Sequence, residues 1–217
     1  MSADNFLLAS QTRIQNWLSD FLDRQNPLSA GLSAAMRHAV LNGGKRVRPS
    51  LVYAAALACG GTLEAADAGA GAVELVHCYS LVHDDLPCMD NDVMRRGKPT
   101  VHVRFGQAQA LLAGDALQAL AFELLTPESD EVPAAIQATL CRLLARAAGH
   151  EGMAGGQAID LASIGRQLGE TELRQMHRLK TGALLQGSVM MGAACGRPDA
   201  GAREALSCYG AAMGLAF

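Results

Sequence analysis

Apolar residues recur along most of this 217-residue chain at spacings of three, four and seven positions, with polar residues between them. In the first such stretch, Ile14, Leu18 and Phe21 fall on one side of a helix. No alternating apolar and polar segment is long enough to predict a strand. The pattern therefore predicts an all-α protein, with helices over residues 5–25, 27–42, 49–59, 64–86, 105–125, 132–148, 150–165, 170–194 and 199–217.

Glycine and proline mark the expected helix ends. Gly43-Gly44 and Gly60-Gly61 are each expected to end a helix, and Pro49 to be the first residue of the next one. Pro27-Leu28-Ser29 is expected to open the second helix, and Pro87 to stop the fourth. No repeat of fixed period and no low-complexity linker interrupts the chain, so residues 1–217 are predicted to form a single domain.

Composition excludes several classes of protein. Half of the residues are hydrophobic and only 4% are aromatic, which favours a helical core over sheet and disagrees with intrinsic disorder. The formal net charge of −3 disfavours a general nucleic-acid binder. The most apolar stretches, such as Ala108 to Leu125, are interrupted by polar residues (here Asp115, Gln118 and Glu123), so no transmembrane helix is expected.

The compartment is inferred from the N-terminus and the cysteines. The chain opens without a basic segment leading into an apolar run, so no signal peptide is predicted. The six cysteines are scattered and form no Cys-x-x-Cys pair. We expect reduced, mostly buried cysteines in a cytoplasmic protein.

One segment concentrates carboxylates beside cations. Four aspartates lie within nine positions and three basic residues follow them: Asp84, Asp85, Asp90, Asp92, then Arg95, Arg96 and Lys98. Carboxylate oxygens at this density suit Mg²⁺, which keeps several waters and bridges to phosphate groups. Pro87 predicts a helix interruption that brings the later carboxylates back towards the first. The alternative is a solvated loop with local Asp–Arg pairs.

A second segment is basic. Lys45 and Arg48 are three residues apart, with Arg46 between them, and a helix is expected to begin at Pro49. Free N–H groups and the positive dipole end of a helix make this a candidate diphosphate pocket. It is not a Walker P-loop, since that spacing of glycines and lysine does not occur. The alternative is a basic helix junction that faces solvent.

These motifs together resemble the trans-isoprenyl diphosphate synthases, or polyprenyl synthases, and are most similar to the bacterial farnesyl diphosphate synthase branch. The residues that carry the resemblance are Gly-Gly-Lys-Arg-Val-Arg-Pro at 43–49, Leu-Val-His-Asp-Asp-Leu-Pro-Cys-Met-Asp-Asn-Asp at 81–92 and Arg95-Arg96-Gly97. Gly114-Asp115-Ala116-Leu117, Gly155-Gly156-Gln157-Ala158-Ile159-Asp160 and Lys180-Thr181-Gly182 follow in the family's order. The resemblance spans the chain after its first helix.

The resemblance implies a role for each matched residue. The metal, Mg²⁺ or Mn²⁺, would be held by Asp84, Asp85 and Asp90 against an allylic diphosphate. Arg95 would contact that diphosphate, and isopentenyl diphosphate would be bound by Lys45, Arg48, His77 and Arg96. The remaining active-site residues would be Lys180, Thr181, Gln157 and Asp160. The implied fold is a bundle of antiparallel helices around a central cavity, assembled as a homodimer.

The implied reaction joins isopentenyl diphosphate to an allylic diphosphate, dimethylallyl or geranyl, and releases pyrophosphate. Metal ions and cationic side chains would stabilise the leaving pyrophosphate, while apolar walls keep water from the carbocation. Tyr79, five positions before Asp84, together with Ser80, would close the cavity below the growing chain and stop it at farnesyl diphosphate. A core tyrosine with a satisfied hydroxyl is the alternative reading of Tyr79.

The chain departs from the family at its C-terminal end. In the family, a segment such as 210–217 leads into a second aspartate-rich motif and further helices, so this chain is either a fragment or a naturally short polypeptide. The resemblance then implies a C-terminally incomplete form that is poorly active or inactive. Two other functions remain open. A terpene cyclase would not need the basic residues Lys45, Arg48 and Arg96, and a non-catalytic subunit of a heteromeric prenyl synthase would be expected to lose the first aspartate motif.

Overall fold

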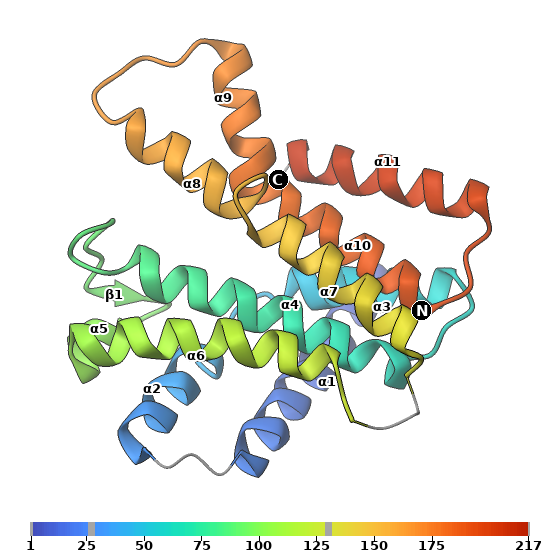
Figure 1. The fold of residues 1–217 in the computed structure, drawn as a ribbon, viewed down its shortest axis with the longest axis horizontal. Coiled ribbons are helices and arrows are strands. Elements are labelled where there is room, and N and C mark those ends of the chain that lie inside the picture. The colour runs from blue at the N-terminus through green and yellow to red at the C-terminus, as the bar shows by residue number, and fades with distance from the viewer. Residues whose placement is uncertain (1, 26–28, 129–131, 217) are drawn as a thin grey trace. The chain divides into compact units, whose positions relative to one another are not determined.

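The computed structural model describes residues 2–25, 29–128 and 132–216, and these are almost entirely helical (Figure 1). The first part contains α1 (Ala3–Arg24), α2 (Ala30–Val40), α3 (Val47–Ala58), α4 (Leu63–Asp84), α5 (Val101–Phe105) and α6 (Gln107–Leu125). The second contains α7 (Ala134–Ala148), α8 (Met153–Ala162), α9 (Glu170–His177), a π-helical segment η1 (Arg178–Gly182), α10 (Ala183–Cys195) and α11 (Ala200–Ala216). The prediction of an all-α protein is confirmed.

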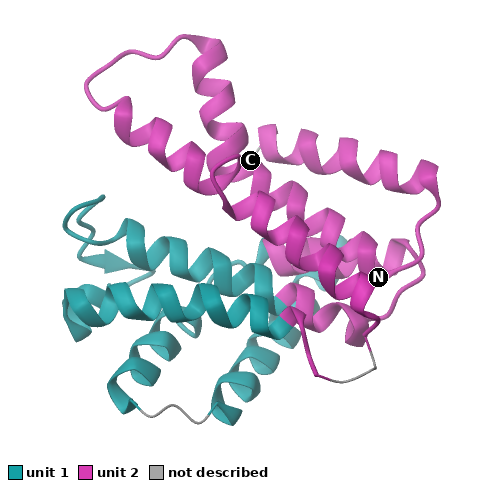
Figure 2. Ribbon diagram, in the orientation of Figure 1, with its two compact units in different colours: residues 1–47, 71–124 teal, residues 48–70, 125–217 magenta. Residues whose placement is uncertain are grey.

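The chain divides into two compact units (Figure 2). The first unit comprises residues 1–47 and 71–124, and the second comprises residues 48–70 and 125–217. The helix α4 contributes to both, because the division falls between Ala70 and Gly71. Each unit has its own buried apolar side chains.

In the first unit, α4 lies at the centre of the helix packing. Its residues from Gly71 to Val76 are all buried, so this stretch has no solvent-facing side. Gly71 lets α1 approach closely, because a Cβ there would lie 2.6 Å from the ring of Trp17. A second cluster joins α2, α4, α5 and α6 and consists of Ala35, Val82, Leu86, Val101, Ala110 and Ala113.

In the second unit, α10 is the most buried helix. It packs against α7 and α11, and its buried side chains include Leu184, Leu185, Val189 and Met191. Gly192 allows close contact with α3, because a Cβ there would overlap the backbone oxygen of Val52. Gly182 and Gly214 let η1 and α11 approach in the same way.

Several predicted boundaries differ from the structure. The third helix begins two residues before Pro49, at Val47, and the stretch 105–125 is divided at Gly106, which has φ +87°. One helix is predicted over 170–194, and helical structure does run from Glu170 to Cys195, with the π-helical segment η1 inside it. Pro27 and Leu28 lie outside the described residues, and Ser29 caps α2 by accepting from the Leu32 N–H.

The structure also contains a short hairpin that the sequence analysis did not predict. Strands β1 (Met94–Arg95) and β2 (Lys98–Pro99) pair antiparallel. The two linking residues, Arg96 and Gly97, have φ +52° and +76°, as a type I′ turn requires. Two-residue strands are too short to show an alternating pattern, so only the glycine in the turn could have indicated them.

One helix among the described residues, α6, is long and apolar enough to cross a membrane by length and composition alone. The sequence analysis predicted no such helix because polar residues interrupt it. Of its 18-residue window, 39% is buried within the structure, and core helices of water-soluble proteins meet the same criteria. It packs beside α4, where the His83 ring lies 3.1 Å from the Leu111 carbonyl oxygen. Its composition is therefore weak evidence for a membrane span.

The close contact at Gly192 gives a first prediction. Gly192→Ala should lower the free energy of unfolding by about 1–3 kcal/mol, because the added methyl group forces α10 away from α3. Gly201→Ala is the matched control, since a Cβ on this α11 glycine meets its nearest atom at an ordinary 3.5 Å. Alanine there should leave stability unchanged or raise it by up to about 1 kcal/mol. Urea denaturation of both variants would test this, and equal effects would contradict it.

Candidate active site

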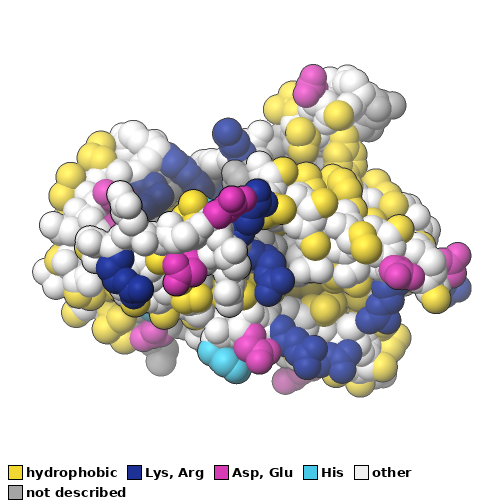
Figure 3. Space-filling model, turned by 90° about the horizontal axis from the view of Figure 1, so that it is seen from above, with side chains coloured by type: hydrophobic (Ala, Val, Ile, Leu, Met, Phe, Trp, Pro, Cys, Tyr) yellow, Lys and Arg dark blue, Asp and Glu magenta, His cyan; other side chains and the backbone are white. Residues whose placement is uncertain are grey.

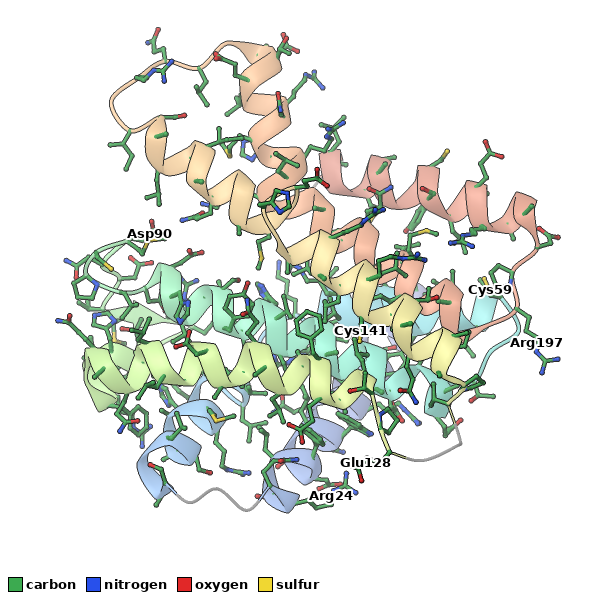
Figure 4. The ribbon with its side chains drawn as sticks, in the orientation of Figure 1. Arg24, Cys59, Asp90, Glu128, Cys141 and Arg197 are labelled. Atoms are coloured by element: carbon green, nitrogen blue, oxygen red, sulfur yellow. The ribbon has the colours of Figure 1, made fainter. Side chains whose placement is uncertain are left out.

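The chain reverses direction directly after α4, and this brings Asp90 back to Asp84. The Asp90 N–H donates to the Asp84 carbonyl oxygen at 2.8 Å, and the Asn91 N–H donates to that of Leu86 at 3.1 Å. Asn91 takes the left-handed conformation, φ +54°, that such a turn needs. The interruption predicted at Pro87 is present. Asp84 is half-buried, whereas Asp90 is exposed on the loop (Figure 4).

Asp85 has a different environment from the adjacent Asp84. It is buried and accepts a forked pair of hydrogen bonds from Arg95, with Nε 2.9 Å from Oδ1 and Nη2 2.6 Å from Oδ1. Arg95 also reaches the exposed Asp92 at 3.4 Å. The hydrogen bond and charge of Asp85 raise the pKa of Arg95 although burial opposes them. The local Asp–Arg pairing left open by the sequence therefore exists, and it engages Asp85 closely and Asp92 at a longer distance.

The carboxylates on this loop can be compared with what a metal would require. Among the residues that the structure describes, no three His, Cys, Asp or Glu side chains converge on one point. Mg²⁺ does not need such a cage, because one or two carboxylates, waters and substrate phosphates complete its six oxygen ligands. Asp84 and Asp90 fit that donor set. Asp85 fits it less well, because Arg95 occupies its oxygens.

Residues 43–47, here called the basic turn, lie in the same unit as residues 84–92, the acidic loop, and are bonded to the hairpin that follows this loop. The Arg96 guanidinium donates to the Gly43 carbonyl oxygen, and the Asn42 side chain donates to that of Arg95 at 3.4 Å. Gly43 and Gly44 have φ +75° and +128°, and a Cβ on Gly44 would meet the Arg96 guanidinium. The structure thus brings Arg96 to the turn that carries Lys45.

The other predicted diphosphate ligands are placed individually. Lys45 is exposed next to the glycine pair, and His77 is half-buried on α4. Arg48 is half-buried in the first turn of α3 and belongs to the second unit. Lys45, His77 and Arg96 therefore share one unit, in which Lys45 and Arg96 are joined through the glycine turn.

Tyr79 is a buried side chain on α4 with a partner on α6. Its ring meets that of His83 edge-on, with centroids 5.7 Å apart. Burial is the main cause that raises the pKa of Tyr79, while a hydrogen bond with Gln118 opposes the rise. The sequence showed Gln118 only as a polar residue that interrupts an apolar helix and gave no sign of its contact with Tyr79. Ser80 is half-buried and donates to the His77 carbonyl oxygen at 2.9 Å.

In the second unit, Lys180 and Asp160 come together. The Lys180 ammonium lies 2.5 Å from Asp160 Oδ2, and both side chains are partly exposed. Gly156 makes this possible, because a Cβ there would overlap the backbone of Lys180. Lys180 and Thr181 lie within η1, and single π-helical turns inside α-helices occur frequently at functional sites. The sequence showed the Lys-Thr-Gly motif but not this wide turn.

Gln157 is the remaining predicted residue of the second unit. Both its amide nitrogen and its amide oxygen are shielded from solvent and have no hydrogen-bond partner among the described residues. Buried polar atoms are nearly always paired in native proteins, so an exception needs an explanation. A polar ligand at this position would supply one.

The comparisons with known proteins agree with this geometry. The family described as Polyprenyl synthetase matches residues 29–217. A farnesyl diphosphate synthase of Haemophilus influenzae is 44% identical over 209 residues, which are 95% of this chain and 70% of that protein. One of Geobacillus stearothermophilus is 44% identical over 219 residues, 100% of this chain and 73% of that protein. The crystal structure of an FPP/GFPP synthase from Zymomonas mobilis has a TM-score of 0.92 at 42% identity, covering 99% of this chain and 78% of that one.

An all-helical chain with two carboxylates at a helix end and cations around a glycine turn has the features of an enzyme that handles diphosphates with a divalent metal. The extent of the matches then settles the family: the chain belongs to the polyprenyl synthetase family. Its isoprenoid synthase fold is confirmed by the same comparisons.

The Asp85–Arg95 pair gives a second prediction. Asp85→Asn should lower the free energy of unfolding by about 1–3 kcal/mol, because the variant removes the charge from a buried, doubly bonded carboxylate. Asp92→Asn is the matched control on the same loop. Its side chain is exposed and its contact with Arg95 is long, so the loss should stay within about 0.5 kcal/mol. Chemical denaturation of both variants would measure the difference, and equal losses would reject the pair as a structural element.

Proposed function

We propose that this protein is a prenyltransferase of isoprenoid biosynthesis that forms farnesyl diphosphate from isopentenyl diphosphate and an allylic diphosphate, dimethylallyl or geranyl. Family membership supports the reaction class, and the two curated relatives above are farnesyl diphosphate synthases. The observation that carries the proposal is the reversal after α4, which brings Asp90 to Asp84 within the unit that also holds the basic turn.

Each group of residues has a distinct task in this reaction. Lys45, His77 and Arg96, with Arg48, would bind the diphosphate of isopentenyl diphosphate through charge-assisted hydrogen bonds. Arg95 would contact the allylic diphosphate while Asp85 holds its guanidinium in place. Lys180 would stabilise the negative charge on the departing pyrophosphate, and the Thr181 hydroxyl dipole would stabilise the allylic cation. Gln157 and Asp160 would orient these groups, Asp160 through its ion pair with Lys180.

The donor set at the acidic loop fits a divalent cation. Asp84 and Asp90 would hold Mg²⁺, or Mn²⁺ in its place, and the metal would neutralise charge on the allylic diphosphate. Asp85 would contribute by orienting Arg95 rather than by binding the metal, which modifies the ligand set implied by the resemblance.

Assembly and location rest on the resemblance and on the sequence. We propose a homodimer in the cytoplasm that acts on free diphosphate substrates and not on nucleic acid. Acidic and basic side chains are interspersed on the face seen in Figure 3, in keeping with the net charge of −3. All activity tests below use the natural polypeptide that carries this sequence.

The two other functions are less well supported. A terpene cyclase has no need of a second diphosphate site, whereas Arg96 is bonded to the turn that carries Lys45. A non-catalytic subunit of a heteromeric synthase would not be expected to keep Asp84 and Asp90 together. Incubation with isopentenyl diphosphate, a labelled allylic diphosphate and Mg²⁺ separates the three. A longer prenyl diphosphate supports the proposal, and a cyclised hydrocarbon or no product contradicts it.

The acidic loop gives a third prediction. Asp84→Ala and Asp90→Ala should each lower kcat on the order of 10²-fold, because each removes a carboxylate that binds the metal. Neither should change the thermal unfolding temperature much, since Asp90 is exposed and Asp84 half-buried. Asp20→Ala, an exposed carboxylate on α1, is the control and should retain full activity. Normal turnover in either loop variant, or in excess EDTA, would reject the metal assignment.

Tyr79 gives a fourth prediction. Tyr79→Ala should shift the products from fifteen carbons towards twenty or more, because it removes the large side chain one turn before Asp84. Tyr79→Phe keeps the ring and loses only the hydroxyl that bonds with Gln118, so its products should stay at fifteen carbons. Chromatography of the dephosphorylated products would show the distribution. A shift in the Phe variant but not in the Ala variant would show that the ring does not set the length.

A further inference from the structure

Arg46 is a buried arginine in the middle of the basic turn. Its guanidinium is withdrawn from solvent and reaches three different helices. It forms an ion pair with Glu74 on α4, donates to Gln15 on α1 at 2.7 Å and donates to the carbonyl oxygen of Val40, the last residue of α2, at 2.6 Å. Because the guanidinium is rigid and planar, these contacts hold the turn against all three helices at once.

This arrangement is unfavourable by several ordinary criteria. Arg46 has φ +50°, a left-handed conformation that non-glycine residues rarely adopt. Burial lowers the pKa of Arg46, but the charge of Glu74 together with the nearby Cys78 outweighs this effect and raises the pKa above its usual value. Removing both charges from water costs free energy, and a buried ion pair is often no more stabilising than two apolar side chains of the same size. Stability alone does not account for the pair.

The contacts do account for the placement of the candidate diphosphate ligands. Lys45 directly precedes Arg46, and His77 lies three residues, about one turn, after Glu74 on the same helix. Binding Arg46 to Glu74 therefore fixes the backbone of Lys45 relative to His77. Two further bonds hold the carbonyl groups of the glycine turn, one from Gln11 to Gly44 at 2.7 Å and one from Arg96 to Gly43.

We propose that Arg46 and Glu74 are positioning residues for the isopentenyl diphosphate site. They do not contact the substrate, because both side chains are buried. They hold the basic turn against α4 so that Lys45 and His77 face the same diphosphate before it binds, which reduces the ordering cost of binding. This proposal rests on the proposed function for the identity of the ligand.

The test uses a double variant, Arg46→Met with Glu74→Met. It removes both charges together, so no unpaired buried charge remains and the thermal unfolding temperature should stay near that of the wild type. The single variants Arg46→Met and Glu74→Gln should unfold at lower temperature. Tyr53→Phe is the control for loss of a buried polar contact, here the 2.7 Å hydrogen bond from Tyr53 to Asp67 in the second unit. Lys45→Ala is the reference for direct loss of a ligand.

In the stable double variant, KM for isopentenyl diphosphate should rise about tenfold, since the charge-assisted contact of Lys45 is weakened rather than removed. KM for the allylic diphosphate should not change, and kcat at saturating substrate should fall less than threefold. Arg46→Lys should also have a raised KM for isopentenyl diphosphate, because the single ammonium group of lysine cannot make the three contacts of the guanidinium. Tyr53→Phe should keep the wild-type KM even if it unfolds at a lower temperature.

A binding measurement separates this proposal from the proposed function. Titration calorimetry with inorganic pyrophosphate, without divalent metal, should show weaker binding in the double variant than in the wild type. Absence of turnover in the wild type would reject the proposed function while the calorimetric difference still supports the positioning role. Equal pyrophosphate affinity in the double variant and the wild type, no binding by either, or an unchanged KM for isopentenyl diphosphate would overturn the positioning role.

Discussion

The buried Arg46 guanidinium fixes the basic turn within the first unit. It joins α1, the end of α2 and α4 at one point, and no apolar side chain could bond to all three. Because α4 is enclosed from Gly71 to Val76, Glu74 has no access to water and must be paired within the protein. The basic turn and the acidic loop are both attached to this helix, the turn through Arg46 and the loop directly at its C-terminal end.

Charge pairing also divides the acidic loop into two parts. Asp85 is buried and bonded to the half-buried Arg95, whereas the Asp90 N–H donates to the Asp84 carbonyl oxygen. The Asp85 pairing holds Arg95 in a defined orientation, and in the proposed function the other two carboxylates, Asp84 and Asp90, bind the metal together with the substrate.

In the second unit, two candidate site residues lie on a wider turn within a continuous helix. The π-helical segment η1 inserts a wider turn between α9 and α10 where Lys180 and Thr181 stand. Small residues at Gly156, Gly182 and Gly214 make room for it. The Lys180–Asp160 ion pair then links η1 to α8. Its partly exposed side chains indicate a position that a substrate can reach.

The sequence by itself determined the helical class, most helix positions, the two charged segments and the family, because these depend on periodicity, composition and spacing within short stretches. It also predicted the interruption at Pro87, since proline cannot continue a helix. Only the tertiary structure decided that Asp85 pairs with Arg95, that Arg46 is buried against Glu74 and that Arg96 reaches the glycine turn. It also decided that the helix widens into a π-helical turn at Lys180. Each of these features depends on which distant side chain lies opposite. Burial decides whether a polar side chain is available to a ligand or must bond to a partner within the protein, and short stretches of sequence do not encode burial.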